Sequence, residues 1–97
     1  MAPEVQALLN AMRELESLLE RNGEDIWSIS VKRAADTVAR TDAHGLTQLL
    51  GLFGGMGSLD DLVLHKDGLP LVSENERLNT LRSNAWGLAT RLKREID

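Results

Sequence analysis

The chain has 97 residues, which is enough for one domain but not for two independent cores, and its net charge is −4. Hydrophobic residues make up 42% and charged residues 27%, a composition that excludes a disordered chain. The absence of cysteine excludes disulfides, a thiolate nucleophile and a cysteine-based zinc site. With no signal-like start and no long apolar run, we expect a small cytoplasmic protein, of bacterial type, and no membrane association.

The first 40 residues predict a helical hairpin. Pro3 suits the first turn of a helix, and Asn22-Gly23 ends it. A second helix follows from Glu24 to Arg40, with Trp27 on its inward face, and the short connection makes the two helices antiparallel. The first helix carries apolar residues at three- and four-residue spacing, which predicts a face turned toward a core: Val5, Leu8, Met12, Leu15 and Leu19.

A short third helix is predicted after Thr41-Asp42, which offers an N-cap, with inward leucines and Phe53 at its end. Gly45 and Gly51 each weaken this helix by about 1 kcal/mol relative to alanine unless close packing requires them. Gly54-Gly55 then stops the helix.

Residues at about 58–72 predict a short irregular or β-hairpin excursion. Ser58 is positioned to cap a turn through Asp61. Two apolar arms, 62–65 and 69–72, flank the turn-like triplet 66–68.

A capping box at Ser73–Glu76 predicts the start of the longest helix, which runs to about Ile96. Its leucine seam matches that of the first helix, so the two should pack together. The expected fold is therefore mainly α: a single four-helix domain over residues 1–97, with an up-down hairpin, a short third helix and a long C-terminal helix.

The glycine-rich segment is the main candidate site. Bare backbone N–H groups at Gly55, Gly57 and Ser58 are suited to hold an anion, but no Gly-Lys-Ser/Thr follows and two acids come directly after. The glycines equally suit a tight reversal of the backbone. In a third interpretation Met56 is an exposed apolar contact on a binding surface.

Further candidates flank this loop. Asp60, Asp61 and His65 belong to the same proposed surface, but their spacing does not match a metal site. Trp86 lies one position off the last helix's seam, so it either extends the core or marks a contact. No serine, histidine and carboxylate form a catalytic pattern, so we expect a non-enzymatic protein without cofactor or metal.

Over the segment from Phe53 to His65 the chain resembles a small bacterial family of domains of unknown function. The family's segment reads Phe-Gly-Gly-Met-Gly-Ser, then Leu or Phe, Asn or Asp, and Asp-Leu, and it lies between helices three and four. Asp60 stands where Asn is associated with the family. The resemblance implies no activity, but it implies that the glycine motif is the family's signature.

These features predict a protein–protein interaction module, one version of which is an immunity- or antitoxin-like protein that masks a basic site. The alternative is a sensory domain that binds a small ligand or anion at the Gly54–Ser58 loop. Nucleic-acid binding through Arg91, Lys93 and Arg94 is disfavoured because acids are interleaved with the bases. The chain is expected to be a monomer or a homodimer.

Overall fold

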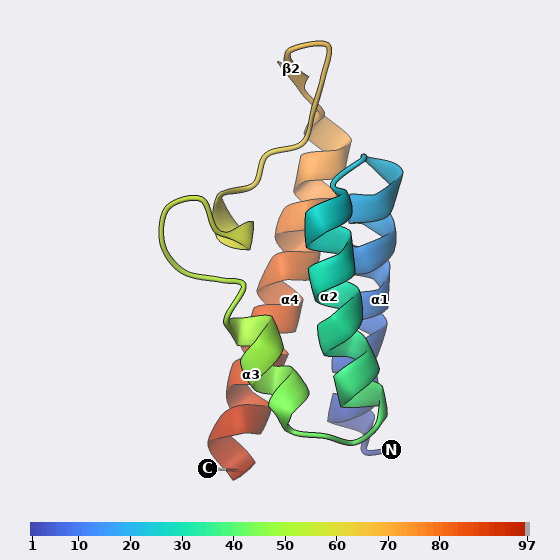
Figure 1. Ribbon diagram of the computed structural model, residues 1–97, viewed down its shortest axis with the longest axis vertical. Helices are drawn as coiled ribbons and strands as arrows, with labels where there is room; N and C mark the ends of the chain where they lie inside the picture. Colours follow the sequence, from blue (N-terminus) through green and yellow to red (C-terminus); the bar gives the residue numbers. More distant parts are fainter. Residues whose placement is uncertain (97) are drawn as a thin grey trace.

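The computed structural model describes residues 1–96, which form four α-helices and a short antiparallel hairpin (Figure 1). The mainly α fold expected from the sequence is confirmed. The elements follow in chain order: α1 (Pro3–Arg21), α2 (Asp25–Ala39), α3 (His44–Leu50), the 3₁₀ turn η1 (Leu59–Asp61), β1 (His65–Lys66), β2 (Leu69–Pro70) and α4 (Val72–Ile96).

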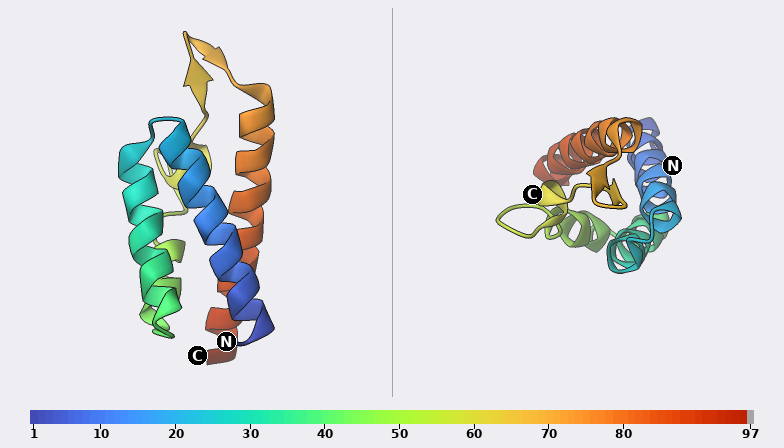
Figure 2. Two further views of the ribbon diagram at one scale, coloured as in Figure 1. Left: turned by 90° about the vertical axis from the view of Figure 1, so that its right-hand side faces the viewer. Right: turned by 90° about the horizontal axis from the view of Figure 1, so that it is seen from above.

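The three long helices lie side by side, and α1 packs against both α2 and α4. The predicted pairing of the first and last helices is therefore confirmed. The short helix α3 packs between α2 and α4 and closes the fourth side, as the end-on view in Figure 2 shows. None of the helices described in residues 1–96 has both the length and the apolar character required to cross a bilayer.

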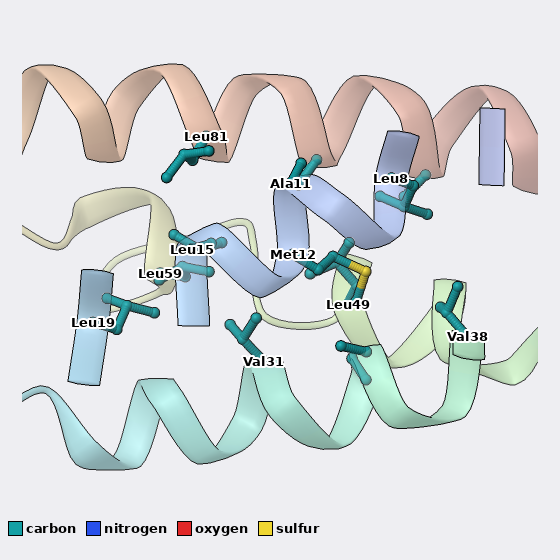
Figure 3. Packing of buried hydrophobic residues seen from close by; sticks show 14 of the residues in the cluster. Leu8, Ala11, Met12, Leu15, Leu19, Val31, Val38, Leu49, Leu59 and Leu81 are labelled. Atoms are coloured by element: carbon teal, nitrogen blue, oxygen red, sulfur yellow. The ribbon is translucent and has the colours of Figure 1, made fainter. Parts of the chain in front are cut away.

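The core is built almost entirely from aliphatic side chains of all four helices and of η1. Figure 3 shows leucines of α1 meeting Val31 and Val38 of α2, Leu49 of α3 and Leu81 of α4. Leu59 of η1 reaches the same interior and is fully buried. The core therefore also anchors the segment that leaves α3. Trp27 packs against the core and stays partly exposed.

Helix α3 ends at Leu50, three residues before the predicted end at Phe53. The amides of Leu52 and Phe53 bond to carbonyls three residues back, which is the tightening that ends a helix. The helix begins at His44 with Ala43 at the N-cap position, which provides no side-chain cap, so the predicted cap at Thr41-Asp42 lies too early; from there the Asp42 carboxylate still accepts the His44 N–H at 2.9 Å. Gly45 is required for packing, because a Cβ there would lie 2.6 Å from Val38 Cγ2.

Helix α4 begins at Val72, and the predicted capping box at Ser73–Glu76 is wrong. The first helical bond runs from the Asn75 N–H to the Leu71 carbonyl at 2.9 Å, and the Asn75 side-chain amide donates to the same carbonyl at 2.8 Å. The hairpin pairs His65 with Pro70, so its turn contains two residues, Asp67 and Gly68, instead of the predicted three. Both residues have positive φ, as a tight two-residue hairpin turn requires.

Candidate functional site

Residues 53–58, which we call the glycine loop, stand out from the helices as an open excursion in Figure 1. Gly54, Gly55 and Gly57 have φ of 92°, 84° and 77°. Side chains other than glycine are strained in this region, although no neighbouring atom would obstruct a Cβ at these positions. Backbone conformation therefore accounts for the glycines.

The glycine loop is closed at its base. The N–H of Leu59 donates to the Leu52 carbonyl at 2.9 Å, and the buried Leu59 side chain holds this junction in the core. Ser58 Oγ accepts the N–H of Asp60 at 3.3 Å, so the predicted cap at Ser58 is confirmed. Asp61 Oδ2 accepts the N–H of Gly57 at 2.9 Å, which ties the loop to η1.

Arg82 of α4 completes the support of η1, and sequence reasoning missed it. Its Nη1 donates to the carbonyls of Leu59 and Leu62 at 2.8 and 2.9 Å, and its Nη2 bonds to Asn79. Burial lowers the pKa of the Arg82 guanidinium, while the charges of Asp60 and Asp61 act in the opposite direction. The only hint in the sequence was its place one helical turn before Trp86.

The loop exposes one large apolar side chain. Met56 is 99% exposed, whereas methionine in a globular protein is most often buried. Nearby, a surface hollow of about 300 Å³ is lined by Phe53, Asp60, Arg82, Ser83 and Trp86. Trp86 is 49% exposed, so it lies on the surface and not in the core. The structure thus brings Asp60 and Trp86 together beside the glycine loop.

His65 does not join this group. It lies in β1, in the hairpin that projects beyond the end of the bundle in Figure 1, and its Nδ1 lies 3.0 Å from the Val63 carbonyl. The Asp60 carboxylate makes no capping contact either, because Ser58 and Asp61 make those contacts. In residues 1–96 no three His, Asp or Glu side chains gather to hold a metal ion.

Asp61 limits what the loop can do chemically. A free nest of N–H groups attracts anions, but the N–H of Gly57 already donates to a carboxylate of the chain itself. The carboxylates of Asp60 and Asp61 would further repel an incoming phosphate. The cations Lys93 and Arg94 lie in the last turn of α4, where positive charge complements the helix dipole.

A family model described as a domain of unknown function (DUF6966) matches residues 20–72. The matched part extends from the end of α1 to the first residue of α4 and includes α2, α3, the glycine loop and the hairpin. No curated protein and no solved structure matches the chain.

Proposed function

The chain belongs to the DUF6966 family of domains of unknown function, so the family gives no activity. From the geometry we propose that the protein is a non-enzymatic module that binds another protein. The proposed surface consists of Met56, Phe53, Trp86 and Asp60. The observation that carries the proposal is a fully exposed methionine on a loop that hydrogen bonds hold in place.

Preorganisation supports a binding role. A mobile loop would lose conformational freedom on binding, whereas this loop is already tied to η1 by Asp61 and to the core by Leu59. Methionine and tryptophan are both enriched at protein interfaces, where they fill apolar pockets of the partner. Loop and hollow together offer apolar contacts beside a carboxylate.

The charge of the region favours a basic partner. Residues 54–72 contain three acids and one lysine, for a net charge of −2, within a chain of net charge −4. A basic partner would be attracted over distance and oriented by this field. An immunity- or antitoxin-like inhibitor of a basic protein is the most specific form of this proposal.

The alternative of a small-anion sensor has less support. Its binding groups are the loop N–H groups, and Asp61 competes for the one at Gly57. A thermal shift with inorganic phosphate separates the two proposals. The protein-binding module predicts no increase in melting temperature, and a saturable increase would favour the sensor.

The test is capture of a partner from a lysate of the native host, followed by mass spectrometry. We expect the natural sequence to retain a protein that Met56→Asp loses. The matched control is Ile26→Asp, because Ile26 is 81% exposed on α2, away from the loop, and receives the same charge. Retention by the control and loss by Met56→Asp would support the proposed surface.

A second variant locates the interface if Met56→Asp still captures the partner. Leu69 in the projecting hairpin is 70% exposed, so Leu69→Asp tests that surface in the same way. Loss with Leu69→Asp and retention with Met56→Asp would contradict the proposal and move the interface to the hairpin.

A further inference from the structure

We propose that the hollow beside the glycine loop receives a cationic side chain, an arginine or a lysine, from an apolar-flanked basic segment of the partner. This inference rests on the proposed function and narrows it to one kind of partner. It follows from the aromatic side chains, the carboxylate and the charge balance at the hollow.

The aromatic side chains come from two elements. Trp86 lies on α4 and Phe53 on the segment after α3, and both line the hollow. The indole of Trp86 is half exposed and makes no hydrogen bond with residues 1–96. A cation against the face of an indole is attracted by the negative face of the ring, and tryptophan is the best aromatic residue for this contact.

Asp60 provides the opposite charge. It is exposed, it lines the same hollow, and its carboxylate accepts no hydrogen bond from the described part of the chain. The neighbouring carboxylate of Asp61 is already held by the N–H of Gly57. A cation in the hollow would therefore meet an indole together with a carboxylate that accepts no hydrogen bond.

Arg82 also lines the hollow, and its positive charge must be weighed against this proposal. Its guanidinium donates to the carbonyls of Leu59 and Leu62 and to Asn79, so these donors are directed at the protein. The charges of Asp60 and Asp61 both act on Arg82, so two negative charges face one positive charge here. Asp60 and Arg82 therefore balance each other in the lining of the hollow, and the carboxylate of Asp61, next to the lining, makes the surrounding charge negative.

The test uses two capped tripeptides, Leu-Arg-Leu and Leu-citrulline-Leu, titrated into the ¹⁵N-labelled protein. Citrulline has nearly the shape of arginine but no charge. We expect the arginine peptide to shift the Trp86 indole signal saturably and to bind about threefold or more tighter than the citrulline peptide, as a cation–π contact with an exposed ion pair implies. The Trp27 indole on α2 is the internal reference and should not respond.

Two charge variants complete the test. Asp60→Asn should remove the preference for arginine over citrulline, and Asp67→Asn in the hairpin turn should leave it unchanged. Circular dichroism checks that both variants are folded. Equal affinities for the two peptides, or no saturable shift of Trp86, would overturn the inference.

The proposed function can fail or hold independently of this result. If a partner is captured through Met56 while the peptides bind equally, the interface is real and its anchor is apolar. If the arginine preference is found but the captured partner is insensitive to Met56→Asp, the hollow binds cations and the loop is not the interface.

Discussion

The side-chain amide of Asn75 binds both backbone groups of Leu64. Its Oδ1 accepts the Leu64 N–H at 2.7 Å and its Nδ2 donates to the Leu64 carbonyl at 2.9 Å. The same carbonyl accepts the N–H of Leu71, so one residue of α4 closes the base of the hairpin. This amide thus holds the base of β1 and β2 to α4, together with the buried Leu64 side chain.

Replacing this amide should destabilise the protein. We expect Asn75→Ala to lower the free energy of unfolding by about 2 kcal/mol, because partly buried backbone groups of Leu64 lose their partners. Chemical denaturation measures the change. Asn84→Ala is the control on the same helix, because Asn84 is exposed and its side chain makes no hydrogen bond with residues 1–96. Equal effects of the two substitutions would show that the amide contributes nothing.

Arg82 should contribute more to the stability of the fold than an ordinary surface arginine does. We expect Arg82→Met to cost about 1–3 kcal/mol of stability, because the carbonyls of Leu59 and Leu62 lose a charged donor. Arg77→Met is the control, since Arg77 pairs with Glu14 at the surface and such pairs contribute at most about 1 kcal/mol.

Hydrogen exchange gives a second measurement on Arg82→Met. The amide of Leu59, which bonds to the Leu52 carbonyl, should exchange faster in this variant than in Arg77→Met. Unchanged exchange at Leu59 would contradict the role of Arg82 in holding the loop base.

Two helical glycines should respond in opposite directions to alanine. At Gly45 a Cβ would lie 2.6 Å from Val38 Cγ2 and 2.8 Å from the Val38 nitrogen, so Gly45→Ala should destabilise the fold by about 1–3 kcal/mol despite its higher helix propensity. At Gly87 no atom lies within 4 Å of the Cβ position, so Gly87→Ala should stabilise it by about 0.5–1 kcal/mol. Thermal unfolding of the pair measures both changes, and shifts of the same sign would refute the packing argument.

Asp36 should make stability depend on pH in the acid range. Hydrogen bonds from Lys32 at 2.7 Å and Arg13 at 2.9 Å hold the pKa of this carboxyl below its usual value. A lowered folded-state pKa stabilises the protein above the unfolded-state pKa, and this contribution is lost as the pH falls through the folded-state pKa. Between about pH 5 and pH 2, the melting temperature of Asp36→Asn should therefore fall less than that of the natural sequence.

Salt provides the control for the Asp36 prediction. The ion pairs of Asp36 with Arg13 and Lys32 are at the surface, so salt screens them. The difference in melting temperature between the two proteins should therefore shrink at high ionic strength. If the melting temperatures of the two proteins fall equally across the acid range, Asp36 does not contribute to the pH dependence of stability.

The helices could be predicted from the sequence because their signals are local. The leucine spacing of α1 reports structure within a few residues of itself, whereas the triplet 66–68 gave the place of the hairpin turn but not its two-residue length. The end of α3 was predicted too late because Phe53 fits the helical period, although the bonds tighten at Leu52 and Phe53 and the helix ends earlier. Periodicity alone does not reveal this competition.

The candidate site was less predictable because it depends on contacts between distant residues. Met56, Asp60 and Trp86 were identified individually by their chemistry, but no spacing places Asp60 and Trp86 at one hollow. The sequence did not single out Arg82, because its acceptors are carbonyls more than 19 residues away in the chain. A side chain that donates hydrogen bonds to backbone carbonyls far away in the chain leaves no pattern in the sequence.

The exposure of Met56 also concentrates oxidant-sensitive sulfur outside the core. Met56 is 99% exposed and Met1 is 58% exposed, whereas Met12 is fully buried among the helices. Thioether oxidation depends on access and converts an apolar side chain into a polar sulfoxide. Mild peroxide would therefore change the chemistry of the glycine loop while sparing the sulfur on which the packing of α1 depends.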